Sequence, residues 1–501
     1  MGGHLSEKNR QTKPNIILLV IDSLRYDHLS INGYFRNTST FLDKLASKGV
    51  NFTSAYANAA WTKPSVATIL TSLHPSSHQT NEIDDRLPDS ISIYLPEVLK
   101  KNSFKTGAFS GIPFLSPLFG FSRGFDVFYS SEREDLSKDI IRAEDLNKKA
   151  LDWLQNVGGY PFFLYVHYVD THSPYIPPEA YKWLYQPTTE KPVTFLNTPR
   201  DEIAKSPEKI FRLITQYDGE INYVDDQLRL FFAELEKLHL LYNTLIIVTS
   251  DHGEEFFEHG FSTHIHSLYE AVLHIPLIMV YHNFLPENST CKTPVSHVDI
   301  MPTILRTIGK EKLPGELEGE SLLPIIQGKN KKNRRIIAEQ LYHLYPIRRT
   351  IISNGFKLTV TYGTKKTKKV ILMDKVSLIK NRIQSRLKPY VQRLRRPSNK
   401  VIFFLVQSII DLILPAKKGF KKAKRNALKQ LEDTQEPILE LYNISIDPGE
   451  KKNLINKMSS KRKELYEELN HFRSSLMERE KSKVILDEKI KERLRALGYL
   501  D

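Results

Sequence analysis

Residues 245–253 have the sequence LIIVTSDHG, in which five apolar or β-branched residues lead to Asp251 and His252. The run lacks helical spacing and predicts a strand that is buried on both faces. In open α/β sheets, ligands bind beyond the carboxyl ends of the parallel strands. Asp251 and His252 are therefore candidate metal ligands, one a hard oxygen and the other a borderline nitrogen. The alternative is a simple turn that caps the next helix.

Two other segments predict buried strands that end in polar residues. Residues 15–21, NIILLVI, are followed directly by Asp22, and residues 162–168, FFLYVHY, are followed by His172 four positions on. Parallel strands bring their carboxyl ends to one edge of a sheet. We therefore expect Asp22 and His172 to lie near Asp251 and His252.

Thr62 precedes a proline in the sequence WTKPSVATILTS. Proline is favoured in the first turn of a helix, where its missing N–H group costs nothing, and we expect Thr62 just before that turn. The free N–H groups and the dipole at such an end favour an anion. Alternatively, Thr62 only caps the helix.

The joint pattern predicts one divalent cation bound by four side chains: Asp22, Thr62, Asp251 and His252. Such a set suits Mn²⁺, Mg²⁺ or Ca²⁺, and Zn²⁺ is also compatible. A threonine hydroxyl is a poor nucleophile until a base or a metal activates it. His172 and His264 would then bind ester oxygens or protonate the leaving group.

Composition narrows the class of protein. A chain of 501 residues with 40% hydrophobic content can form one large domain and a smaller one. The formal charge of +14 favours an anionic partner, but no nucleic-acid recognition motif is present. The single cysteine, Cys291, excludes intrachain disulfides and a cysteine-based zinc cluster. Without a signal region or a run of 18 apolar residues, a cytoplasmic location is expected.

Several short motifs follow one another along the chain in the order found in a known enzyme family. DSLRYDHL follows the first predicted strand, and Thr62-Lys63-Pro64-Ser65 follows later. Further on come DTHSP (170–174), SDHGE (250–254), YEAVLHIPLI (269–278), HVDIMPT (297–303) and ELYNISIDPGEKKNL (440–454). The chain thus resembles the sulfatases of the alkaline phosphatase superfamily. That resemblance implies a large, mostly parallel α/β sheet sandwiched by helices, with a small C-terminal α+β subdomain.

The departures from the sulfatase pattern concern the chemistry. Sulfatases convert a cysteine or serine to formylglycine, but this position holds Thr62, which cannot form the same aldehyde. The arginine that supports the aldehyde is replaced by Val66, and the second carboxylate of the first motif by Ser23. A threonine with an Asp-His pair instead resembles lipoteichoic acid synthases, phosphoglycerol transferases and, in part, phosphonate monoester hydrolases.

Three functions follow from this resemblance. The preferred one is hydrolysis or transfer of a phosphodiester or phosphoglycerol-type ester, with Thr62 as the nucleophile. A sulfuric ester hydrolase that uses Thr62 without formylglycine is the alternative. A non-catalytic binding protein on the same scaffold is the third, although a binder has no need of a metal-activated hydroxyl. The sequence does not define the oligomeric state.

The predicted domains are a catalytic unit at residues 1–340, a C-terminal subdomain at 341–363 and 431–501, and an insertion at 364–430. Within the insertion, residues 401–414 would form a helix of about 21 Å, too short for a hydrocarbon core of about 30 Å. It is either a core or dimer helix, or an interfacial anchor on an anionic membrane. The anchor would place the protein peripherally on the inner membrane face.

Liposome binding tests the anchor. The full chain is expected to pellet with anionic liposomes at low salt and to be partly released as salt screens the contacts, since each engaged Lys or Arg contributes about 1 kcal/mol. Deleting residues 365–429 should abolish binding and leave activity on a small soluble diester. A full-length chain that ignores anionic liposomes would instead indicate a core or dimer helix.

Overall fold

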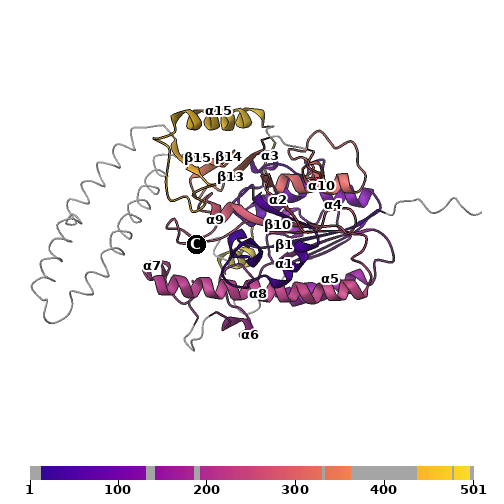
Figure 1. The fold of residues 1–501 in the computed structure, drawn as a ribbon. Helices are drawn as coiled ribbons and strands as arrows, with labels where there is room; N and C mark the ends of the chain where they lie inside the picture. Colours follow the sequence, from indigo (N-terminus) through magenta and orange to yellow (C-terminus); the bar gives the residue numbers. More distant parts are fainter. Residues whose placement is uncertain are drawn as a thin grey trace, which may run out of the picture.

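The computed structural model describes residues 13–130, 141–185, 192–329, 333–362, 437–476 and 479–496. A nine-stranded sheet forms the centre, and helices cover both of its faces (Figure 1). A four-stranded antiparallel sheet with a long helix on it forms a smaller C-terminal unit. The predicted fold class, a mixed and mostly parallel α/β sheet with a small α+β subdomain, is confirmed.

The strands that carry the predicted ligands lie side by side in the large sheet. β1 (Asn15–Ile21) runs parallel to β6 (Phe162–Tyr168) and to β7 (Thr244–Thr249), with Ile21 beside Tyr168 and Val20 beside Thr249. Their carboxyl ends therefore meet at one edge. The full order is β11 (Ser289–Cys291), β2 (Val50–Tyr56), β10 (His274–Val280), β7, β1, β6, β4 (Lys105–Ser110) and β5 (Val127–Ser130), with β12 (Val295–Ser296) paired to β2.

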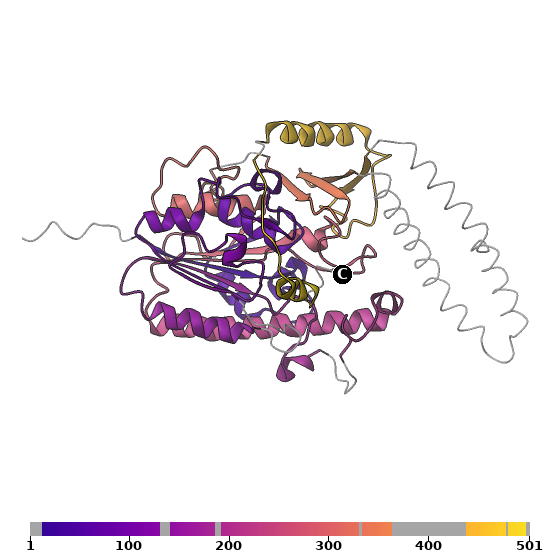
Figure 2. The same ribbon diagram turned by 180° about the vertical axis from the view of Figure 1, so that it is seen from behind.

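Alternating side chains of β1 enter two separate hydrophobic cores. Ile16, Leu18 and Val20 pack in one core, whereas the intervening residues pack in the other. This follows from the two-residue period of a strand that is covered on both faces. One face is covered by α1 (Thr40–Ser47), α5 (Ala143–Leu154) and α8 (Pro207–Lys237), and the other by α2 (Thr62–Thr71), α4 (Leu95–Lys101) and α10 (Ile300–Thr307) (Figures 1 and 2).

Helix α2 begins one residue earlier than the sequence predicts. Trp61 is its N-cap, so Thr62 is the first helical residue and does not precede the first turn. Pro64 lies inside that turn, where no intrahelical N–H bond is lost.

The shorter elements are α3 (Pro75–His78), α6 (Glu179–Lys182), α7 (Arg200–Ala204), α9 (Glu270–Leu273), α11 (Leu323–Ile326), α16 (Glu488–Ala496), β3 (Asp85–Arg86), β8 (Glu255–Phe256), β9 (Ser262–Thr263) and β17 (Ser482–Lys483).

The small sheet begins earlier than the predicted division after residue 340. β13 (Arg335–Gln340) pairs with β14 (Ile347–Ser353), so residues 335–340 are part of this sheet. β15 (Phe356–Tyr362) and β16 (Ile438–Asn443) complete it. Helix α15 (Ser459–Ser475) packs on one face and buries Leu465 and Leu469.

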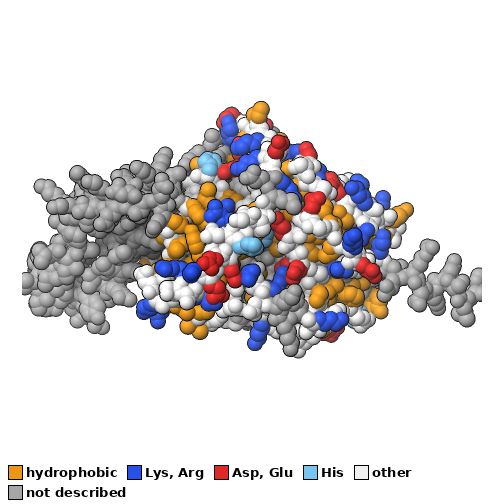
Figure 3. All heavy atoms as spheres, turned by 90° about the horizontal axis from the view of Figure 1, so that it is seen from above, with side chains coloured by type: hydrophobic (Ala, Val, Ile, Leu, Met, Phe, Trp, Pro, Cys, Tyr) orange, Lys and Arg blue, Asp and Glu red, His pale blue; other side chains and the backbone are white. Residues whose placement is uncertain are grey.

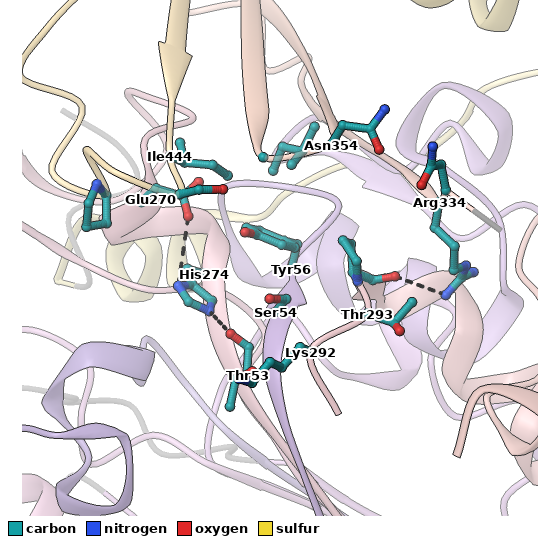
Figure 4. A pocket seen from close by; sticks show the side chains of 16 residues that line it. Thr53, Ser54, Tyr56, Glu270, His274, Lys292, Thr293, Arg334, Asn354 and Ile444 are labelled. Carbon is teal, nitrogen blue, oxygen red and sulfur yellow. Dashed lines mark hydrogen bonds and ion pairs between the residues drawn. The ribbon is translucent and has the colours of Figure 1, made fainter. Parts of the chain in front are cut away.

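Buried ion pairs join the two sheets. Lys357 of β15 lies 3.0 Å from Glu270 of the large unit and 3.0 Å from Glu450, and all three residues are buried. A cavity of about 570 Å³ lies at the same junction (Figure 4). Its arginine, Arg334, pairs with Asp299 at 2.7 Å, and it holds none of the predicted site residues.

All of the chain's excess positive charge lies in one segment. Residues 364–430 hold 20 of the 72 Lys and Arg residues but two of the 58 Asp and Glu residues. This insertion, with the helix predicted at 401–414, lies outside the described residues. On the face shown in Figure 3, basic and acidic side chains lie intermixed. Among the helices that the structure describes, none has the length and apolar character needed to cross a membrane.

Candidate active site

The carboxyl ends of three strands bring four ionisable side chains together. Asp22 follows β1, His167 lies near the end of β6, and Asp251 and His252 follow β7. All four are fully buried. His167 Nε2 lies 3.5 Å from Asp22 Oδ2, and His252 Nε2 lies 3.4 Å from Asp251 Oδ2. Asp22, His167 and Asp251 offer ligand atoms that all lie within 4.8 Å of one another.

Thr62 reaches this cluster from the start of α2. Its Oγ1 lies 3.3 Å from His252 Nε2 and 3.5 Å from Asp22 Oδ2. The position at the amino end of a ten-residue helix also favours negative charge near the hydroxyl. The structure therefore brings together all four predicted ligands: Asp22, Thr62, Asp251 and His252.

The cluster fits a divalent cation. Asp251 Oδ2 is buried without a hydrogen-bond partner among the described residues, a state that native proteins rarely tolerate. Burial, and then the nearby charge of Asp22, raise the pKa of Asp251 to about 8. A cation held by the two carboxylates would satisfy the unpaired oxygen and offset their mutual repulsion.

His252 has the tautomer that a metal ligand needs. Its Nδ1 lies 2.9 Å from the carbonyl oxygen of Gly253 and can only donate to it. Burial lowers the pKa of His252, which favours the neutral ring. The Nε2 atom then keeps a lone pair, directed toward Thr62 and the two carboxylates.

His167 is a site residue that the sequence prediction missed. It lies within β6, beside Val20 of β1. The sequence analysis treated the whole of this segment as a buried strand and therefore did not consider His167 as a site residue. An ionisable residue inside an otherwise apolar strand was the available signal. Tyr165 OH lies 2.9 Å from His167 Nδ1, and the proton in that hydrogen bond decides the role of the ring. A lone pair on Nε2 makes His167 a ligand, whereas a proton there makes it a donor to Asp22.

His167→Ala is expected to weaken metal binding by about 10–100-fold, the range found when the groups that orient metal ligands are removed. Titration of the metal-free chain with Mn²⁺ measures the change. Tyr165→Phe is a companion variant, because it removes only the phenolic partner of Nδ1 and should weaken metal binding in the same direction. An unchanged Mn²⁺ affinity in His167→Ala would show that His167 neither binds the ion nor orients one of its ligands.

His172 and His264 lie next to the cluster, as predicted. Their ring centroids are 5.1 Å apart, and the ring of His264 lies 4.3 Å from that of His252. Both residues are buried, and burial lowers the pKa of His172 and takes that of His264 well below its usual value. His172 Nδ1 donates to the carbonyl oxygen of Ser173 at 2.6 Å, so its Nε2 can accept a proton.

Two buried residues that the sequence prediction missed hold His264. Glu254 Oε1 lies 3.1 Å from His264 Nδ1, and the Tyr175 hydroxyl donates to Glu254 Oε2 at 2.7 Å. Burial raises the pKa of Glu254 well above its usual range. His259, another histidine of this region, does not join the cluster. It contacts the small unit, where its Nε2 donates to the carbonyl of Gly449 at 3.1 Å.

The residues that depart from the sulfatase pattern have clear structural roles. Ser23, where a second carboxylate would stand, adopts a φ of 58° and donates its hydroxyl to Asp22 at 2.8 Å and its N–H to Asp251 at 3.1 Å. Such backbone strain is typical of functional sites. Val66 is fully buried and offers no charge.

Two family models match the chain. The model described as Sulfatase matches residues 14–310, and the one described as N-sulphoglucosamine sulphohydrolase, C-terminal, matches residues 257–373. An arylsulfatase of Clostridium perfringens is 25% identical over 393 residues, which cover 65% of this chain and 81% of that protein. A Δ4,5-hexuronate-2-O-sulfatase of Bacteroides thetaiotaomicron is 23% identical over 379 residues, which cover 67% of this chain and 76% of that protein.

Solved structures share the fold. The complex of BT4656 with its substrate D-glucosamine-2-N,6-O-disulfate superposes with a TM-score of 0.68 at 18% identity and covers 92% of this chain and 98% of that one. The phosphonate monoester hydrolase of Agrobacterium radiobacter superposes with a TM-score of 0.65 at 17% identity and covers 95% of this chain and 100% of that one. At these identities the similarity supports the fold alone.

Proposed function

Because the chain belongs to the sulfatase family, we propose that it hydrolyses or transfers a phosphodiester or phosphoglycerol-type ester through Thr62. One observation carries the proposal: Thr62 Oγ1 lies 3.3 Å from His252 Nε2 and 3.5 Å from Asp22 Oδ2, inside a site that fits a cation. The hydroxyl is thus placed where an otherwise weak nucleophile can be activated.

The bound cation would act as a Lewis acid that lowers the pKa of the Thr62 hydroxyl. Thr62 Oγ1 then forms a bond to phosphorus as the bond to the leaving alcohol oxygen breaks. The Thr62 hydroxyl loses its proton to solvent as its pKa falls, and His172 or His264 passes a proton from solvent to that leaving oxygen. Water or a second alcohol attacks the phospho-threonine in the second step, which restores the Thr62 hydroxyl.

Phosphorus is preferred over sulfur because of the residues around Thr62. Formylglycine chemistry requires a residue other than threonine, and the fully buried Val66 stands where sulfatases carry the supporting arginine. A phosphodiester carries one negative charge, as a sulfate monoester does, so the same site suits either. The sulfatase names of the relatives favour the second candidate, sulfuric ester hydrolysis by an unmodified Thr62.

Intact-protein mass measurement tests the nucleophile and the element together. The Mn²⁺-loaded chain is incubated with bis(4-nitrophenyl) phosphate or with 4-nitrophenyl sulfate and quenched in acid. We expect a phosphoryl adduct with the diester, located on Thr62, and none in Thr62→Ala. An adduct only with the sulfate ester would favour the second candidate, and a covalent modification of Thr62 before any substrate is added would contradict both.

His172→Ala and His264→Ala are each expected to lower turnover by about 10²–10⁴-fold, the usual range for positioned acid–base groups. Metal content should stay unchanged, because the two rings lie beside the cluster and not among its four ligands. His282→Ala, at an exposed histidine 3.8 Å from Glu287, is the control and should retain full turnover. Loss of metal in His172→Ala would move that ring into the ligand set.

A further inference from the structure

Arg200 lies beside the loop that carries His264. It is the exposed first residue of α7, and its Nη1 donates to Ser262 Oγ at 3.3 Å. Ser262 is only two residues before His264. The acidic neighbours of Arg200 are engaged elsewhere, since Asp201 pairs with Lys205 at 2.7 Å and Glu202 pairs with Lys209. The charge of Arg200 is therefore not neutralised by its own helix.

A second arginine reaches the same loop from the small sheet. Arg348 of β14 donates to the carbonyl oxygen of His266, and its residue exposure is 8%. Burial, and then Arg200 and Arg348, lower the pKa of His266 to about 3. Both positive charges thus lie close to this imidazole ring. Residues 262–266 are contacted by arginines from two separate parts of the fold.

Exposure to solvent increases from the buried cluster, through the loop at residues 262–266, to Arg200. His252 is fully buried, His264 is 4% exposed, His266 is partly exposed and Arg200 is exposed. The rings of His252 and His264 are 4.3 Å apart, so the series begins at the reacting centre. The part of a substrate that lies beyond its reacting ester must extend toward solvent, and Arg200 stands on that side.

The chain outside residues 364–430 has no net positive charge that would attract anions in general. Outside residues 364–430 the chain has 52 Lys and Arg residues against 56 Asp and Glu residues. Attraction of an anion to the described part of the protein must therefore come from local charges. Arg200 is an exposed residue, and its guanidinium lies 5.0 Å from the centre of the Phe195 ring, with one N–H group bonded to Ser262. The other N–H groups of such an arginine suit a carboxylate, sulfate or phosphate.

We propose that Arg200, with Arg348 behind His266, forms a second anion subsite next to the reacting centre. The subsite rests on the proposed function and specifies its substrate class: an ester that carries a further anionic group on the side of the substrate that faces solvent. Arg200 binds that group directly, and Arg348 holds the loop and adds positive charge.

Binding of two non-reacting phosphonates to the Mn²⁺-loaded full chain tests the subsite. Methylphosphonate occupies only the reacting position, whereas 2-carboxyethylphosphonate adds a carboxylate. Calorimetric titration is expected to show about tenfold tighter binding of the carboxylated compound, since a charge-assisted hydrogen bond at a partly exposed site is worth about that factor. Arg200→Ala should remove this preference and leave methylphosphonate affinity unchanged, and Arg200→Lys should keep part of it.

Lys205→Ala is the matched control, because it removes a neighbouring charge that is already paired with Asp201. It should keep the tenfold preference. The subsite would be overturned if the unaltered chain bound the two phosphonates equally, or if the preference survived in Arg200→Ala. Turnover of simple diesters would still support the proposed function in that case. Failure to bind either phosphonate, together with failure to cleave any diester, would overturn both.

Discussion

Thr62→Ala is expected to lower turnover by about 10⁴–10⁶-fold, the scale found when a catalytic nucleophile is removed. The hydroxyl lies between His252 and Asp22, and no other hydroxyl of α2 shares that position. Thr62→Ser should retain measurable activity, because serine keeps the hydroxyl and loses only a methyl group. Steady-state kinetics with bis(4-nitrophenyl) phosphate measure both effects.

Thr71→Ala is the matched control on the same helix. Thr71 is also fully buried, but its hydroxyl donates to the carbonyl of Ala67 at 2.6 Å and has no role in the site. The variant should lose some thermal stability and keep its turnover. If Thr62→Ala retains near-normal turnover on the diester, threonine is not the nucleophile and the mechanism fails.

Removing the metal is expected to abolish turnover, and Mn²⁺ should restore it best. Elemental analysis should find one tightly bound divalent ion per chain, since the described part of the chain contains one such cluster, built on two carboxylates. Asp251→Asn should lose both the ion and the activity, because the amide replaces a charged ligand. Two tightly bound ions per chain would contradict a mononuclear site, and full activity in chelator would contradict metal dependence.

Metal affinity should also depend on pH in a defined direction. Burial and Asp22 raise the pKa of Asp251 to about 8, so the metal-free site holds a proton below that pH. A cation must displace this proton. The apparent affinity for Mn²⁺ should therefore fall about tenfold for each pH unit below the pKa and level off above it. Titrations between pH 6 and 9, roughly the window around that pKa, give the slope.

The central strands were predictable because their sequences allow little else. NIILLVI and FFLYVHY form β1 and β6 with the predicted bounds, since continuous apolar runs need cover on both faces. The parallel register then explains why Asp22 and Asp251 meet. The fold and the proximity of the two carboxylates could therefore both be predicted from where the buried strands end.

Other parts of the site depend on packing that a pattern of residue types does not encode. His167 is inside β6, and only the register against β1 turns it toward Asp22. Glu254 follows the predicted Asp-His pair, but its bond to His264 depends on the fold of the loop between them. The early start of the small sheet at β13 depends on its pairing with β14 across a separate loop.

The pairing of β15 with β16 bears on how the insertion at residues 364–430 is joined to the fold. Thr361 near the end of β15 lies opposite Ile438 at the start of β16, so the segment leaves and rejoins the fold at neighbouring points. A short hairpin loop could join the two strands in the same pairing. We therefore expect the insertion to behave as a portable module, transferable between the corresponding strands of another family member and free to diverge faster than the catalytic unit.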